Sequence, residues 1–174
     1  MSDFNKFLPL LLKCEGGYVN NPNDKGGCTN KGITLKTYNQ YYGVPYHREL
    51  CCGDLRQITD KQVEHIYKDG YWDKCKADQI ISQRIANLLV DMAVNSGVKR
   101  AVRLMQEIVG VTQDGIIGNI TLNAINNSRE DLIYSLFRQR RIDYYYDLVD
   151  KDPKQAVFLK GWLNRIKIYD EKES

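Results

Sequence analysis

The chain has 174 residues, of which 43% are hydrophobic and 27% charged, and its formal net charge is +3. These values are ordinary for a globular protein and favour one domain, or one domain with a short second lobe. Because the charged residues are spread along the chain, they exclude a basic nucleic-acid-binding arm and a basic membrane helix.

The apolar stretches of the chain are short. None approaches the roughly 18 residues that a membrane span needs. The apolar run near the N-terminus is interrupted by Pro9 and by interspersed charges. We therefore expect neither a transmembrane segment nor a standard signal peptide.

The five cysteines are Cys14, Cys28, Cys51, Cys52 and Cys75. An odd count without a secretory signal favours free thiols over a disulfide framework. His47 and His65 are the two histidines, and no zinc-ligand spacing forms around them. We expect no metal ion and no cofactor.

The first half of the chain alternates helical and turn-rich segments. Residues 4–15 have apolar side chains at helical spacing, although Pro9 must kink this helix or mark its start. Residues 16–35 are rich in Gly, Asn and Asp, which predicts tight turns and a small β-hairpin. Thr59 and Gln62 form a predicted capping box at the start of a helix over residues 59–69.

Residues 83–96 are apolar nearly all round, which is typical of a buried helix. Asn87, Asp91 and Asn95 form one polar stripe on it, and this stripe must be hydrogen-bonded or face a wet cleft. Further helices are predicted at 98–109, 119–127, 129–149 and 154–168, with Ser128 as a cap for the third of these. The sequence thus predicts an α+β fold that is predominantly α-helical.

Glu15 is the strongest candidate for a catalytic group. It follows an apolar helix, and both desolvation and the negative end of the helix dipole favour its protonated form. A general acid needs such a protonated carboxyl. The alternative is an ordinary surface glutamate near a helix end.

Asp24 lies in the polar turn region, where solvation favours the ionised form. Two carboxyls whose environments differ in this way are typical of glycoside hydrolysis. Thr29 is a candidate for holding a nucleophilic water. The alternatives are a turn-forming role for Asp24 and a hairpin-stabilising role for Thr29.

Four further residues are candidates for sugar binding. The aromatic rings of Tyr18, Tyr71 and Trp72 present faces on which a pyranose can stack, while core packing is the alternative, above all for Trp72. Asn95 can hydrogen-bond an acetamido group, or it can cap its helix.

Several separated motifs together resemble glycoside hydrolase family 108. The similar segments are Glu15–Tyr18 (EGGY), Asp24–Thr34 (DKGGCTNKGIT), Tyr71–Trp72 and Asp91–Gly97 (DMAVNSG). Two later segments, Asp114–Thr121 (DGIIGNIT) and Gly161–Arg165 (GWLNR), resemble the peptidoglycan-binding region that follows in that family.

The resemblance implies an N-acetylmuramidase with a lysozyme-like fold, a small N-terminal β-hairpin or Gly-rich loop and a helical C-terminal lobe. Residues 1–97 would form the catalytic region, and residues 98–174 a peptidoglycan-binding-like region packed on it. Glu15 corresponds to the proposed catalytic acid of the EGGY motif. Phage-type lysozymes show a similar series of Glu, Asp and Thr along the chain. Thr29 lies one position closer to Asp24 than the Thr of that series does, so Thr34 is the second candidate for its role.

The expected partner is the glycan strand of bacterial peptidoglycan, with no nucleic acid. The family is similar to proteins once called secretion activators, so phage-lysis or secretion partners are possible. We expect synthesis in the bacterial cytoplasm and action on the cell wall after export by another route. A lytic transglycosylase on the same fold and a non-catalytic wall-binding protein are the alternative functions.

Overall fold

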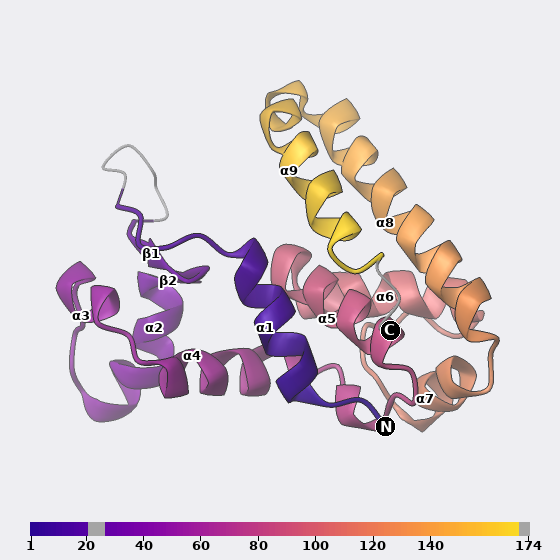
Figure 1. Cartoon of the computed structure of the whole chain (residues 1–174), viewed down its shortest axis with the longest axis horizontal. Coiled ribbons are helices and arrows are strands. Elements are labelled where there is room, and N and C mark those ends of the chain that lie inside the picture. The colour runs from indigo at the N-terminus through magenta and orange to yellow at the C-terminus, as the bar shows by residue number, and fades with distance from the viewer. Residues whose placement is uncertain (21–26, 171–174) are drawn as a thin grey trace. The chain divides into compact units, whose positions relative to one another are not determined.

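The computed structural model describes residues 1–20 and 27–170, and it is mostly helical with one small antiparallel sheet (Figure 1). The predicted α+β, predominantly helical fold is confirmed. The chain forms two compact units, one of Leu8–Gly70 and one of Met1–Phe7 with the chain from Tyr71 onward. Helix α1 (Phe4–Cys14) begins in the second unit, contains Pro9 and ends in the first.

The Leu8–Gly70 unit holds the hairpin and several short helices. Its further elements are β1 (Thr29–Asn30), β2 (Ile33–Thr34), α2 (Leu35–Tyr42), a 3-10 turn (Val44–Tyr46), α3 (Cys52–Arg56) and α4 (Asp60–Tyr67). The predicted capping box of α4 is present, since Thr59 accepts from the Gln62 backbone and Gln62 accepts from the Thr59 backbone. Helices α2 and α3 were not predicted.

The hairpin closes through a two-residue turn, Lys31-Gly32. Both residues have positive φ, +50° and +75°, as a type I′ turn requires. Asn30 pairs with Ile33 on either side of this turn. The Asn30 side chain also donates to the carbonyls of Leu55 and Arg56, which fixes β1 against the end of α3.

A disulfide joins Cys28, directly before β1, to Cys52, the first residue of α3. The expectation of free thiols was therefore wrong for these two cysteines. Their Cα atoms lie 5.9 Å apart, because the fold brings the start of the hairpin to the start of α3. Cys14, Cys51 and Cys75 are free thiols.

The second unit contains the long helices. They are α5 (Gln83–Ser96), α6 (Val98–Val109), α7 (Asn119–Asn126), α8 (Glu130–Lys151) and α9 (Ala156–Lys167), with 3-10 turns at Ala77–Gln79 and Pro153–Gln155. These five helices agree with the predicted ranges. Ser128 is not the cap of α8, because its hydroxyl donates to the carbonyl of Ala124 and Arg129 occupies the cap position.

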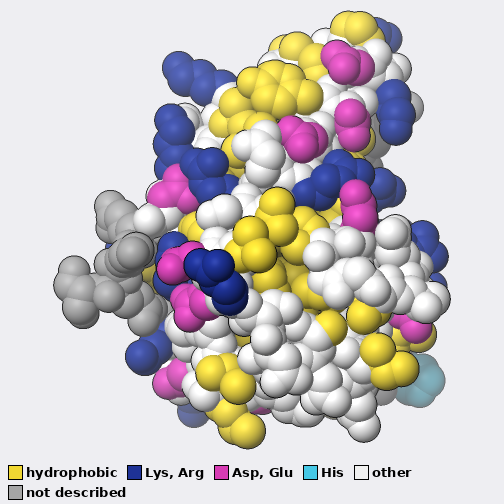
Figure 2. All heavy atoms as spheres, turned by 90° about the vertical axis from the view of Figure 1, so that its right-hand side faces the viewer, with side chains coloured by type: hydrophobic (Ala, Val, Ile, Leu, Met, Phe, Trp, Pro, Cys, Tyr) yellow, Lys and Arg dark blue, Asp and Glu magenta, His cyan; other side chains and the backbone are white. Residues whose placement is uncertain are grey.

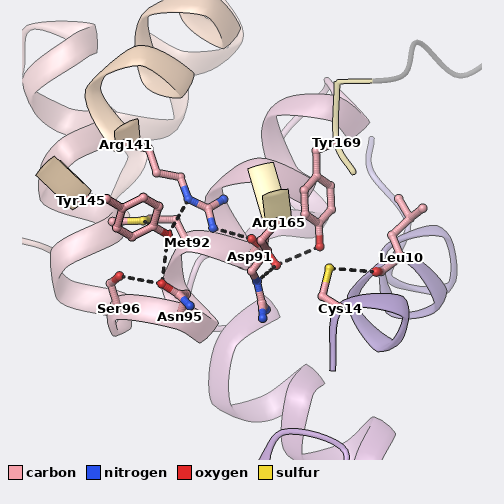
Figure 3. Close-up of polar contacts among 10 residues, drawn as sticks. All are labelled: Leu10, Cys14, Asp91, Met92, Asn95, Ser96, Arg141, Tyr145, Arg165 and Tyr169. Carbon is pink, nitrogen blue, oxygen red and sulfur yellow. Dashed lines mark hydrogen bonds and ion pairs between the residues drawn. The ribbon is translucent and has the colours of Figure 1, made fainter. Parts of the chain in front are cut away.

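A buried ionic network holds α5, α8 and α9 together (Figure 3). One oxygen of Asp91 accepts from Arg141 at 2.6 Å, and the other accepts from Arg165 at 2.8 Å and from the Tyr169 hydroxyl at 2.9 Å. Burial alone would lower the pKa of Arg141, but the Asp91 carboxylate raises it. The polar stripe on α5 is therefore hydrogen-bonded, the first of the two predicted alternatives.

The surface of the second unit carries scattered apolar side chains. Ile116, Ile120, Leu132, Leu136 and Phe158 are among those that are largely exposed. On the face shown in Figure 2, hydrophobic side chains gather in separate patches bordered by charged ones. No helix within residues 1–20 and 27–170 is long and apolar enough to cross a membrane.

Candidate active site

Glu15 is the first residue after helix α1, which ends at Cys14 before Gly16 and Gly17. Its side chain is half-buried. The chain that follows is held to the hairpin, because the backbones of Val19 and Thr29 exchange hydrogen bonds of 2.9 and 2.8 Å. Both sides of Glu15 are thus anchored, by the helix before it and by the bridge to β1 after it.

The Glu15 carboxyl lies against the backbone of Gly32 in the hairpin turn. A Cβ atom added at Gly32 would come within 2.1 Å of Glu15 Oε2 and 2.5 Å of its Cδ. Real Cβ atoms essentially never approach so closely, so the Glu15 carboxyl would have to move if residue 32 carried a side chain. The positive φ of residue 32 also favours glycine, because glycine adopts this backbone conformation without a steric cost.

Tyr67, the last residue of α4, completes this cluster. Its hydroxyl donates to the carbonyl of Lys31 at 2.7 Å, and a Cβ at Gly32 would lie 2.6 Å from the same hydroxyl. The tyrosine is 1% exposed. The buried Tyr67 side chain therefore fixes the turn against which the Glu15 carboxyl packs. The end of α1, the hairpin and α4 thus meet at the Glu15 carboxyl.

The two candidate threonines are cross-strand partners, Thr29 opposite Thr34. The Thr34 hydroxyl caps helix α2 by accepting from the Thr37 backbone at 3.1 Å. Thr34 thus has a structural role that accounts for its side chain. Thr29 is half-buried on the hairpin, and its role in holding water stays a prediction.

Asp24 lies outside the described residues. Tyr18 is half-buried, and the Arg56 guanidinium carbon lies 5.3 Å from the centroid of its ring, a cation–π arrangement. Its predicted sugar contact stays a prediction. Among residues 1–20 and 27–170, no group of His, Cys, Asp and Glu side chains is placed to hold a metal ion.

Three predicted binding residues belong to the second unit. Trp72 is 0% exposed, and its ring centroid lies 5.5 Å from those of both Phe4 and Phe7. It packs in the core and presents no surface to a sugar, which corrects its predicted stacking role. Tyr71 is half-buried in the π-helical segment Lys68–Trp72.

Asn95 is half-buried at the end of α5. Its side-chain oxygen accepts from the Tyr145 hydroxyl at 2.9 Å and from Ser96 at 3.3 Å. This oxygen is thus engaged within the network of Figure 3. The predicted contact of Asn95 with an acetamido group would therefore be made by its side-chain amide nitrogen, and this contact stays a prediction.

Sequence reasoning did not identify Gly32 and Tyr67 as parts of the site. Gly32 stands within the motif segment Asp24–Thr34, and a glycine after Lys31 between two strand-like segments is a hairpin-turn signal. Tyr67 lies within the helix predicted over residues 59–69, where nothing in its spacing marks it as part of a site. Its hydroxyl contact depends on the packing of α4 against the turn, which no local pattern reveals.

Comparison with known proteins identifies two regions. Residues 8–97 match the family described as glycosyl hydrolase 108, and residues 100–167 match a family described as a predicted peptidoglycan domain. The solved structure of Brucella abortus SagA is similar over 96% of this chain and 91% of that one, with 33% identity and a TM-score of 0.81. A search of curated proteins gave no match.

The matched regions follow each other along the chain. They place the Glu15 cluster within the hydrolase region, and helices α7 to α9 with all but the first two residues of α6 within the peptidoglycan region. Together they support a glycoside hydrolase that acts on peptidoglycan. The chain belongs to the glycosyl hydrolase 108 family.

Proposed function

We propose that the protein is an N-acetylmuramidase that cleaves the bond between N-acetylmuramic acid and N-acetylglucosamine, with Glu15 as the general acid. The observation that carries this proposal is the contact of the Glu15 carboxyl with the Gly32 turn. A fixed, half-buried carboxyl at the end of an apolar helix is suited to proton transfer, because catalysis requires its position to be set before the substrate arrives.

In the proposed reaction, Glu15 gives its proton to the glycosidic oxygen as the bond from that oxygen to the anomeric carbon breaks. Positive charge develops on the sugar ring, and a water molecule adds to the anomeric carbon and loses a proton to a base. We assign the base or charge-stabilising role to Asp24 and the water-holding role to Thr29. Tyr67 acts as a positioning residue, because it holds the turn beneath the acid.

Product analysis tests the bond and the reaction type. Purified peptidoglycan is digested with the wild-type protein, and the soluble products are identified by mass spectrometry. We expect reducing ends on N-acetylmuramic acid. Products ending in 1,6-anhydro-N-acetylmuramic acid would instead identify a lytic transglycosylase, and reducing N-acetylglucosamine ends would identify the other glycosidic bond as the target.

A further inference from the structure

A groove of about 400 Å³ lies in the second unit, and no residue of the Glu15 cluster lines it. It runs from the end of α5 along α6 to α8. It is lined by Ser96, Gly97, Lys99, Arg100, Arg103, Leu104, Glu107, Gln113 and Arg140. We refer to it as the α6 groove.

The α6 groove is strongly basic. Four cationic side chains and one carboxylate line it, a net charge of +3, which equals the formal net charge of the whole chain. Arg140 contacts the one carboxylate, Glu107, at 3.1 Å, and also approaches Asp147 at 3.7 Å. The positive charge of the groove therefore comes from the other three cations.

Those three cations are Lys99, Arg100 and Arg103, and all are exposed. Within the part of the chain that the structure describes, none of them forms a direct ion pair. Arg103 does act on Asp114, whose pKa is lowered by hydrogen bonds from Gln106 and from the Ile116 backbone and, to a smaller extent, by the charge of Arg103. Arg100 lies 5.1 Å from the ring centroid of Tyr144, which orients its guanidinium. All three side chains line the same groove, which brings their charges toward one space.

The position of these charges on α6 opposes the helix dipole. Lys99 and Arg100 lie in the first turn, where the dipole favours acidic residues, and this turn contains none. The N-cap Gly97 provides no side-chain hydrogen bond to the first turn. Cationic side chains at a helix N-terminus are repelled by the partial positive charge of the helix dipole there. Such unfavourable local arrangements are expected at functional sites. A bound anion relieves the repulsion.

We propose that the α6 groove binds the free carboxylate groups of the peptide stems of peptidoglycan. This inference rests on the proposed function, because it takes peptidoglycan as the substrate. Arg100, Arg103 and Arg140 lie within the region that matches a predicted peptidoglycan domain. Carboxylates are the anionic groups of that polymer, and the planar guanidinium matches them through paired hydrogen bonds.

Binding of insoluble peptidoglycan, freed of teichoic acid, tests the inference by co-sedimentation. All proteins carry Glu15→Gln, so that binding is measured without cleavage. The test variant is Lys99→Gln/Arg100→Gln/Arg103→Gln. The matched control is Lys151→Gln/Lys154→Gln/Lys160→Gln, which removes three exposed cations from the same unit outside the groove. Each protein is also tested on peptidoglycan whose carboxyl groups have been amidated with carbodiimide and methylamine.

We expect the test variant to lose about tenfold in affinity for native peptidoglycan, because three modest ion pairs are lost together. The control variant should bind like the parent, and the parent should bind amidated peptidoglycan as weakly as the test variant does. The melting temperature of the test variant should not fall, since two of the three removed charges, Lys99 and Arg100, oppose the α6 dipole.

Equal losses in the test and control variants would contradict the inference, because net charge alone would then explain binding. Unchanged binding of the parent to amidated peptidoglycan would also contradict it, and so would tighter groove-dependent binding to purified polyglycerol phosphate. The products released by the protein with native Glu15 test the muramidase proposal separately, so failure of the two claims can be told apart.

Discussion

The carboxyl of Glu15 rests on the backbone of Gly32, so closely that a single methyl group at residue 32 would lie 2.1 Å from Oε2. The two residues belong to different elements, the end of α1 and the turn between β1 and β2. The contact therefore depends on how the hairpin folds back on the helix, and it sets where the proposed acid stands.

Substitution of Gly32 by alanine tests this contact. The new Cβ must displace the Glu15 carboxyl, and a displacement of about 1 Å in a catalytic group costs on the order of a hundredfold in rate. We expect such a loss in peptidoglycan hydrolysis. The control is Gly110→Ala, which has a similar φ of +72° but no atom within 4 Å of the added Cβ.

Both alanine variants share the backbone cost of positive φ, about 1–2 kcal/mol. Gly110→Ala should therefore lose stability to chemical denaturation but keep its activity at temperatures where it is folded. Similar activity losses in both variants would mean that backbone strain, and not contact with Glu15, explains the requirement at Gly32.

Substitution of Asp91 by asparagine should destabilise the second unit strongly. Asp91 and Arg141 are both fully buried, and removal of one partner leaves the other charge without compensation, at a cost of about 3–5 kcal/mol. The comparison is Asp170→Asn, whose partner Arg138 is about one third exposed, so that solvent screens the lost charge. Urea unfolding measures both, and equal changes in unfolding free energy would contradict the assigned role of Asp91.

Loss of the disulfide should lower the free energy of unfolding. The bond closes a loop with a sequence separation of 24 residues, and chain entropy predicts a contribution of about 3.5 kcal/mol for such a loop. We expect the Cys28→Ser/Cys52→Ser variant to unfold at lower denaturant concentration than wild type. Cys51→Ser, which removes the neighbouring exposed thiol, should unfold like wild type, and a similar change in both would argue against the bond.

The free cysteines should differ in reactivity with a thiol reagent. Cys51 is exposed, whereas burial raises the pKa of Cys75 to about 12 from its ordinary value of 9.0. Since the thiolate is the nucleophile, Cys51 should react rapidly at pH 8 and Cys75 only after unfolding. Mass spectrometry of labelled peptides identifies the sites, and rapid labelling of Cys75 in the native protein would contradict its burial.

The same raised pKa predicts a loss of stability in alkali. The unfolded chain releases the Cys75 proton above about pH 9, whereas the folded protein retains it up to about pH 12. The stabilisation from the buried neutral thiol is therefore complete below pH 9 and is lost as the pH rises toward 12. Denaturant midpoints measured across this range check the direction of the change.

Periodic patterns in the sequence were sufficient to predict the long elements. Helices α5 to α8 each bury several side chains, α9 buries Ile166, and the capping box at Thr59 marks the start of α4. Helix α3 has only 5 residues, and α2 buries Tyr38 alone, so neither shows an apolar period in the sequence. Their positions depend on side-chain anchors such as Asn39, which bonds the backbone of Leu50 in both directions.

The candidate acid was also visible in the sequence, because an acid followed by two glycines at the end of an apolar helix is a local feature. The groups around it were not, since Gly32 and Tyr67 reach Glu15 through tertiary packing. The same limit explains two errors. The disulfide between Cys28 and Cys52 requires the hairpin to meet α3, and the burial of Trp72 requires Phe4 and Phe7 from α1.

The most direct measurement compares wild type with Glu15→Gln on purified peptidoglycan, by the rate at which reducing ends appear. Glutamine has nearly the same shape but cannot donate a carboxyl proton, so we expect a loss of about 10²–10⁴-fold with unchanged unfolding and unchanged wall binding. A Glu15→Gln protein that releases reducing ends at the wild-type rate would contradict the assignment of Glu15 as the catalytic acid.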